Sequence, residues 1–139
     1  MRTLGSPAFA ALPASAAAGP IFLLSLGAAQ AYALVPQPIP IDLGSLAIYL
    51  AFALVPAAIF GFVIGFVPNA IGTHVLSKAG ETSQTARAPI FWVGIGAALG
   101  FGFAVLIGVF RDSPAGTFAL VLTSAICAGL CRARTQWED

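Results

Sequence analysis

The chain has 139 residues, of which 59% are hydrophobic and only 8% are charged, and its formal net charge is +1. About a quarter of the residues of a soluble domain are charged. This composition therefore excludes a water-facing globular surface and indicates an integral membrane protein with a single domain. The sequence has no basic stripe that could neutralise a phosphate backbone, so we expect no nucleic-acid binding.

Four apolar segments are long enough to cross a bilayer, which takes about 20 residues. Charged residues lie between these segments and not inside them. We predict an all-α integral membrane protein, a bundle of four transmembrane helices at residues 14–35, 46–67, 89–110 and 115–131. Alternating prolines within residues 35–40 predict a short, stiff loop after the first helix.

The second apolar segment is too long for one straight span. Residues 43–77 carry no charge, and a continuous helix of that length would reach about 53 Å, beyond a hydrocarbon core of about 30 Å. Pro56 and Pro68 are the candidate kinks or breaks. We predict a long, proline-interrupted second helix that continues as an amphipathic interfacial helix at residues 69–79. Gly80 then marks its end.

Prolines also predict where the last two helices begin. Pro89 is suited to the first position of the third helix, which places Trp92 at the level of the lipid headgroups. Between the third and fourth helices the chain reads Arg-Asp-Ser-Pro. There Ser113 can cap the fourth helix and Pro114 can occupy its first position.

The distribution of Lys and Arg predicts how the helices cross the membrane. If the N-terminus is cytoplasmic, Arg111 is the one cation on the opposite side. The cytoplasmic side then holds Arg2, Lys78, Arg87, Arg132 and Arg134. Because cytoplasmic loops are enriched in Lys and Arg, we predict a protein of the cell membrane, the bacterial inner membrane, with both termini cytoplasmic.

One alternative for the first segment stays open. Arg2, the apolar stretch after it and the small residues of Ala29-Gln30-Ala31 resemble a secretory signal that is cleaved before Tyr32. Cleavage would leave three helices in the same orientation. Against it stands the long, proline-interrupted lead that precedes the apolar stretch.

Small residues recur every four positions in the third predicted helix and, more briefly, in the second. Such strips allow two helices to approach closely, which provides van der Waals contact where lipid supplies no hydrophobic driving force. We predict helix packing at Gly61, Gly65, Gly94, Gly96, Gly100, Gly102, Ala104 and Gly108. These strips could pack helices two, three and four against one another. Alternatively, the third helix pairs with a second copy of the chain or with another membrane protein.

Few side chains are suited to catalysis or to binding a metal ion or cofactor. His74 is the only histidine, and it has no acidic or thiol partner at ligand spacing. We interpret it as a polar residue at the membrane surface, and Asn69 as a polar residue beside the break at Pro68. Cys127 and Cys131 lie four positions apart in one predicted helix, and we interpret them as small apolar residues rather than a disulfide. We therefore expect no metal, no cofactor and no enzymatic reaction.

Together these features favour a small polytopic membrane protein without enzymatic chemistry. It would act as an accessory or scaffold subunit of a membrane complex, or as a self-associating bundle, through its small-residue helix faces. Its partners would be the lipid bilayer and a second copy or another membrane protein. The alternative is a small oligomeric channel or an uncoupled facilitator for a small solute, with a pore constricted at the broken second helix.

Overall fold

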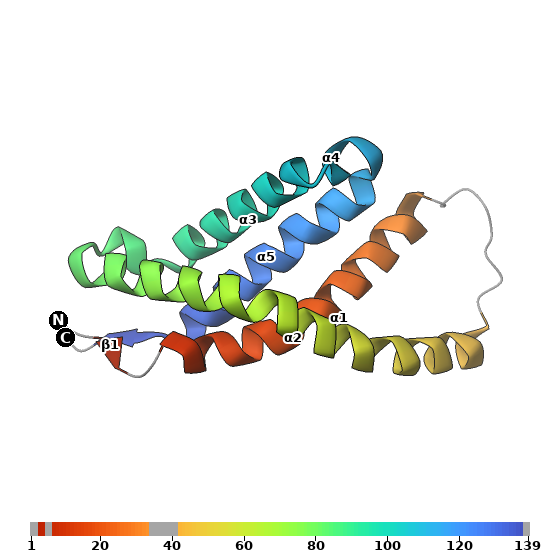
Figure 1. Ribbon diagram of the computed structural model, residues 1–139, viewed down its shortest axis with the longest axis horizontal. Coiled ribbons are helices and arrows are strands. Elements are labelled where there is room, and N and C mark those ends of the chain that lie inside the picture. Colours follow the sequence, from red (N-terminus) through yellow and green to blue (C-terminus); the bar gives the residue numbers. More distant parts are fainter. Residues whose placement is uncertain (1–2, 5–6, 34–41, 138–139) are drawn as a thin grey trace.

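A computed structural model of the chain describes residues 3–4, 7–33 and 42–137, and these residues are almost entirely helical (Figure 1). The elements are β1 (Thr3–Leu4), α1 (Pro7–Ala33), α2 (Leu43–Thr82), the 3-10 helix η1 (Thr85–Arg87), α3 (Pro89–Leu106), α4 (Val109–Asp112), α5 (Pro114–Arg134) and β2 (Gln136–Trp137). Helices α1, α2, α3 and α5 are each long and apolar enough to cross a membrane. The prediction of four such helices is therefore confirmed, whereas the proline-rich loop lies outside the described residues.

Prolines and capping residues set the starts of the helices as the sequence predicts. Pro89 and Pro114 occupy the first turns of α3 and α5, where a missing N–H leaves no helical bond unmade. The Ser113 hydroxyl caps α5 by accepting a hydrogen bond from the Gly116 N–H at 3.0 Å. At the start of α2, the Asp42 carboxylate accepts hydrogen bonds from the backbone N–H groups of Gly44 and Ser45, both at 3.2 Å.

The Asp42 cap gives the start of α2 a dependence on pH. Hydrogen bonds from the Ser45 side chain, the Ser45 backbone and the Gly44 backbone lower the pKa of Asp42 below its ordinary value of 3.8. The cap therefore stabilises α2 above pH 3.8 and is lost as the pH falls through the folded pKa. We expect the Gly44 backbone NMR shifts to move in this range in the wild type but not in Asp42→Asn, which keeps a capping oxygen and cannot titrate. Equal shifts in both proteins would contradict this account.

The second helix is continuous, which corrects the predicted break. Both Pro56 and Pro68 lie inside α2, and the helix passes Gly80 to end at Thr82. A proline removes one N–H donor from the ladder, but leaving the chain unwound among apolar surroundings would strand many more backbone groups. Residues 69–79, which the sequence predicts as a helical extension of this helix, form the last part of α2.

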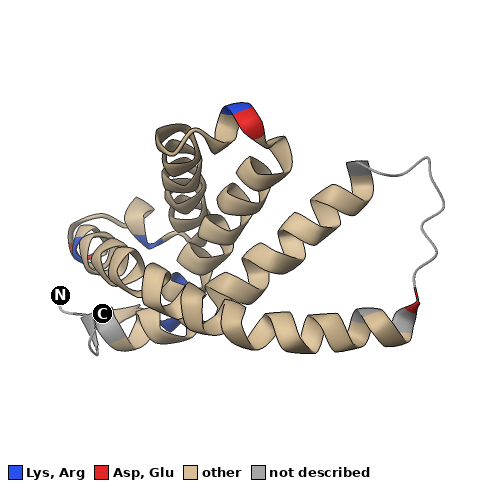
Figure 2. Ribbon diagram, turned by 45° about the vertical axis from the view of Figure 1, so that its right-hand side comes forward, with Lys and Arg blue, Asp and Glu red and all other residues tan. Residues whose placement is uncertain are grey.

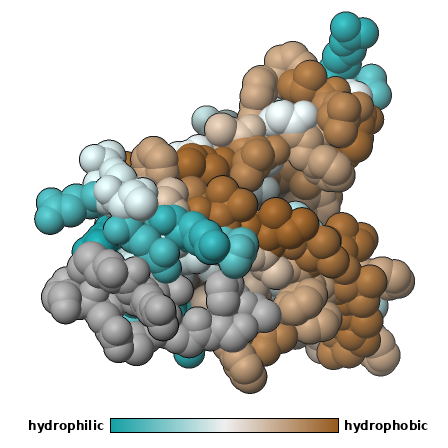
Figure 3. Space-filling view, turned by 60° about the vertical axis from the view of Figure 1, so that its left-hand side comes forward, coloured by the Kyte–Doolittle hydropathy of each residue, from teal (hydrophilic) through white to brown (hydrophobic). Residues whose placement is uncertain are grey.

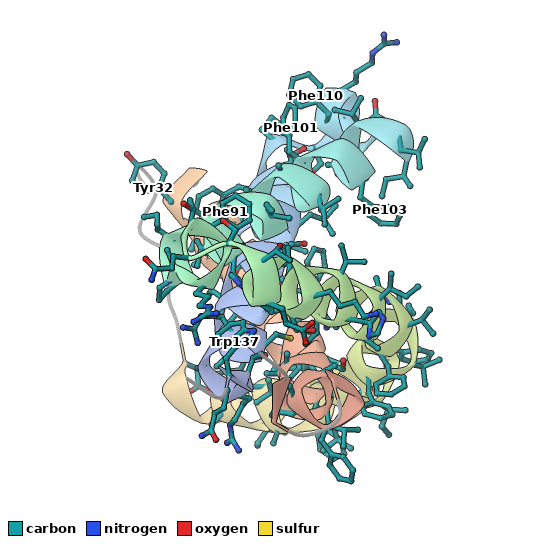
Figure 4. The ribbon with its side chains drawn as sticks, turned by 90° about the vertical axis from the view of Figure 1, so that its left-hand side faces the viewer. Tyr32, Phe91, Phe101, Phe103, Phe110 and Trp137 are labelled. Carbon is teal, nitrogen blue, oxygen red and sulfur yellow. The ribbon has the colours of Figure 1, made fainter. Side chains whose placement is uncertain are left out.

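The third helix is shorter than predicted. It ends at Leu106, because Gly108 has a positive φ of 80° that the helix cannot continue through. Gly108 therefore belongs to a turn and not to a helix-packing face. The short helix α4 follows, and Phe110 on α4 meets Phe101 on α3 edge-on, with ring centroids 5.4 Å apart (Figure 4). This contact holds the turn against the end of α3.

The helices pack in the order α3, α5, α1 and α2, with α5 in contact with both α3 and α1. The main partner of α2 is α1, which corrects the expectation that the second helix packs against the third and fourth. Pro13 and Pro20 lie inside α1, whose two halves run in different directions (Figure 1). Its first half runs beside α2, and its second half diverges from the start of α2.

The chain ends meet at one end of the molecule, where β1 and β2 form an antiparallel pair (Figure 1). Lys and Arg gather at this end, whereas Arg111 and Asp112 form the tip between α3 and α5 (Figure 2). Much of the surface between these charged ends is apolar (Figure 3). Large exposed side chains include Phe52, Ile59 and Val63 on α2 and Ile90, Leu99 and Leu106 on α3. The apolar surface that the sequence predicts is thus present on the helices themselves.

Candidate helix-packing and interaction sites

At the crossing of α1 and α2, glycines let the two backbones come into direct contact. A Cβ atom added to Gly19 would overlap the carbonyl oxygen of Ala57, and one added to Gly61 would overlap the backbone nitrogen of Gly19. Both obstacles are backbone atoms, so they cannot turn aside as a flexible side chain can. Gly65 lies one turn beyond Gly61 and faces Ala18 across the same pair of helices. Two of the predicted packing glycines therefore lie against α1.

A polar pair lies beside this crossing. Asn69 on α2 donates its side-chain N–H to the Ser15 hydroxyl at 3.2 Å, and Ser15 donates to the Ala11 carbonyl at 2.8 Å. Ser15 is fully buried and Asn69 is half-buried. Asn69 thus joins two helices and does not satisfy a break next to Pro68.

Replacing Asn69 should weaken the contact between α1 and α2 modestly. Hydrogen bonds between membrane helices contribute on average about 0.6 kcal/mol and at most about 1.7 kcal/mol. We expect Asn69→Ala to lower the free energy of unfolding within that range, as measured by titration with a denaturing detergent. In a double-mutant cycle, Ser15→Ala should remove most of the effect of Asn69→Ala. Fully additive losses would mean that the two side chains do not interact.

The second packing site joins α3 to α5. Gly96, Gly100 and Ala104 are buried at spacings of four residues. A Cβ atom on Gly96 would lie 2.5 Å from the Ser124 carbonyl oxygen, and one on Gly100 would lie 2.8 Å from the Leu120 carbonyl oxygen. These glycines therefore let α3 lie directly on the backbone of α5.

The other small residues of α3 form a second face, which we call the open face. Gly94, Ala98 and Gly102 are exposed, and an added Cβ atom on either glycine would meet no described atom within 4 Å. Among the described residues, no helix covers this face. The predicted packing residues of α3 thus divide between two faces. Gly96, Gly100 and Ala104 form the occupied face, which α5 covers, and the others lie on the open face.

The residues considered for chemistry are one exposed histidine and two buried thiols. His74 is exposed on α2. Cys127 and Cys131 are free and buried in α5, where the Cys127 thiol donates to the Ala14 carbonyl at 3.3 Å. Within the described ranges, no three His, Cys, Asp or Glu side chains gather as a metal site would require.

A cluster of two tryptophans and two arginines lies at the end that holds both chain termini. We call Arg87, Trp92, Arg132 and Trp137 the tryptophan–arginine cluster. The rings of Trp92 and Trp137 meet edge-on with centroids 6.5 Å apart. Trp92 is fully buried, and its indole N–H donates to the Ala86 carbonyl at 2.7 Å. Trp92, which the sequence predicts at the headgroup level, is thus packed inside the protein.

Trp137 ties the last residues of the chain to α2. Its ring lies over Gly80, where an added Cβ atom would be 2.6 Å from the ring, and its indole N–H donates to the Ser77 carbonyl at 3.2 Å. The Arg87 Nε–H donates to the Gly80 carbonyl at 2.7 Å. Gly80 is therefore needed for close approach of an aromatic ring and does not end the helix.

This cluster could not be predicted from sequence patterns, because its members come from four separate elements. The Lys and Arg distribution did place Arg87 and Arg132 on the same predicted side of the membrane. Their contacts, however, depend on β2 folding back along the end of α2. A pattern read along one helix cannot reveal such a contact.

Comparison with known proteins offers no relative from which a role for these residues could be transferred. The geometry of the helix faces and of the cluster is the basis for functional inference. The chain matches no protein-family model, and no curated protein and no solved structure is significantly similar to it.

Proposed function

We propose that the chain is an integral membrane protein that acts without enzymatic chemistry, as an accessory or scaffold subunit of a membrane complex or as a self-associating bundle. The open face of α3 is the observation that carries this proposal. Small residues at Gly94, Ala98 and Gly102 leave a flat strip on which another helix can lie closely. The occupied face of the same helix is an internal example, because α5 lies against Gly96 and Gly100 in this way.

The surface composition supports placement in a membrane. Phe52 and Ile90 are 78% and 81% exposed, and such large apolar side chains along whole helices are unfavourable in water. Charges lie at the ends of the long helices (Figure 2). The cation-rich end also holds both termini, which supports a cytoplasmic location for both ends in the bacterial inner membrane. Reporter fusions to each terminus test this orientation, and an active extracytoplasmic reporter at either end would contradict it.

The channel alternative assumed a pore constriction at a break in the second helix, at Pro56 or Pro68. That break is absent, because α2 is continuous through both prolines. Solute flux through proteoliposomes remains the direct measurement for this alternative. We therefore favour association through the open face.

Cysteine cross-linking in native membranes tests the proposed role of the open face. The native thiols of Cys127 and Cys131 are buried, so the parent protein supplies a low background. We expect Ala98→Cys to form an oxidative adduct, either a dimer of the chain or an adduct with another membrane protein. Adding Gly102→Leu should abolish this adduct, because the larger side chain would hold the partner helix away.

A cysteine elsewhere on the surface supplies the matched control. Val63 on α2 is 66% exposed, and Val63→Cys should give no adduct under the same conditions. A dimer band at Ala98→Cys would identify self-association, and a larger hetero-adduct would identify an accessory subunit. If Ala98→Cys gives no adduct, or if Gly102→Leu leaves the adduct unchanged, the open face does not bind a partner helix.

A further inference from the structure

Helices α5 and α2 differ in the apolar length that each would bring to a membrane. The uncharged part of α5, residues 114–131, is about 27 Å long and matches an upright crossing of a hydrocarbon core of about 30 Å. The uncharged part of α2, residues 43–77, lies in one continuous helix. It is about 53 Å long, so it fits the same core only if the helix lies about 55° from the membrane normal.

The directions of the helices in the fold agree with this difference in length. Helices α3 and α5 lie side by side, and α2 runs obliquely to both of them (Figure 1). The contacts of α2 with α1 fix its direction, through the backbones of Gly19 and Gly61 and the hydrogen bond from Asn69 to Ser15. When α5 stands upright in a bilayer, α2 is therefore already tilted, without any rearrangement of the chain.

The first half of α2 is uncovered along its whole length. Among the described side chains of α2, none before Thr73 is buried. Phe52 and Val55 are 78% and 65% exposed. With Ala51 and Pro56 they line an open hollow of about 400 Å³ on the surface of the helix. Because its lining offers no charged, amide or hydroxyl side chain, hydrocarbon is the partner that suits it.

We propose that α2 crosses the bilayer obliquely while α5 stands upright, and that the first half of α2, residues 43–56, binds lipid acyl chains. Asp42 and Lys78, the charged residues that flank the uncharged part of α2, then lie at opposite surfaces of the membrane. A helix longer than the bilayer is thick can adapt by tilting. This inference rests on the proposed insertion into a membrane.

Spin labels on single introduced cysteines, in phosphatidylcholine vesicles, test the oblique path of α2. Ile48 and Val75 are 60% and 59% exposed, and they lie about 40 Å apart along the helix axis. We expect both labels to lie in the hydrocarbon, with depths that differ by about 23 Å. The parent protein, whose thiols are buried, measures the background. An upright helix would place at least one of the two labels in water, and that result would overturn the proposal.

A label at Val55 tests whether lipid is the partner of the hollow. A label that faces acyl chains collides often with dissolved oxygen and rarely with a water-soluble nickel chelate. We expect this pattern for Val55→Cys. The reverse is expected for Gln84→Cys, because Gln84 is exposed in the polar linker after α2. If the Val55 label is shielded from both reagents, protein and not lipid covers this surface, and the proposal is wrong.

Labels on α5 separate the failure of this inference from the failure of membrane insertion. Phe118 and Ile126 are exposed on α5, and an upright helix separates them by about 12 Å in depth. If both labels lie in water, the chain is not inserted and the proposed function fails as well. If they lie in hydrocarbon at this separation while the Ile48 or Val75 label lies in water, only the oblique crossing is wrong. A clearly smaller separation on α5 would mean that α5 is not upright, which also contradicts the proposal.

A second pair of positions on α2 keeps the test usable if a variant loses its helical circular dichroism. Tyr49 and Ile71 are 74% and 60% exposed. They lie about 33 Å apart along the helix, which still exceeds the hydrocarbon core. We expect labels at both to lie in hydrocarbon at once, with depths that differ by about 19 Å, and a difference of about 33 Å would contradict the oblique path.

Discussion

We expect that replacing either Gly19 or Gly61 with alanine separates α1 from α2. The added Cβ atom would overlap the Ala57 carbonyl in the first case and the backbone of Gly19 in the second. Overpacking generally costs about 1–3 kcal/mol, and more where the surroundings cannot yield. Since backbone atoms block the space here, each variant should lose about 3 kcal/mol or more of unfolding free energy in a denaturing-detergent titration.

Glycines elsewhere on the same helices provide the control for this prediction. An added Cβ atom on Gly27 in α1 or on Gly72 in α2 would meet no described atom within 4 Å. Alanine is also the better helix former by about 1 kcal/mol. Gly27→Ala and Gly72→Ala should therefore leave the unfolding free energy unchanged or raise it slightly. A loss as large as that of Gly61→Ala would mean that the crossing of α1 and α2 does not cause the effect.

The presence of the four long helices and the starts of α3 and α5 could be predicted because they depend on local features, whereas α1 begins at Pro7, earlier than predicted. Apolar length identified the helices, and Pro89, Ser113 and Pro114 marked starts that the structure confirms. The error at α2 was also local in origin. Two prolines were interpreted as kinks or breaks, yet α2 continues through both, because each proline removes only its own N–H from the helix while an unwound segment would leave more backbone groups without partners.

The pairing of the helices could not be predicted, because a strip of small residues does not identify its partner. On α2 the spacing of four extends beyond Gly61 and Gly65 through the buried or half-buried residues Asn69, Thr73 and Ser77. The matching residues of α1 are Ala11, Ser15 and Gly19. This repeat was visible in the sequence, but polar members interrupt it. Rows of residues four apart are the ridges by which helices commonly interlock.

The two faces of α3 lead to opposite expectations for the same substitution. We expect Gly96→Ala and Gly100→Ala each to lower the unfolding free energy by about 1–3 kcal/mol. Their added Cβ atoms would lie 2.5 Å from the Ser124 carbonyl oxygen and 2.7 Å from the Ser124 hydroxyl oxygen. Titration with a denaturing detergent measures this loss. We expect α3 to move away from α5, because the carbonyl groups of Ser124 and Leu120 belong to the α5 backbone and cannot move aside.

The open face supplies the matched control on the same helix. Gly94→Ala and Gly102→Ala add the same methyl group where no described atom lies within 4 Å. They should therefore leave the stability of the monomer unchanged while weakening the cross-link formed through Ala98→Cys. If all four variants lower stability equally, the methyl group acts on the helix itself and the two faces are not distinct. Opposite outcomes on the two faces would instead separate the residues that hold the chain together from those available to a partner.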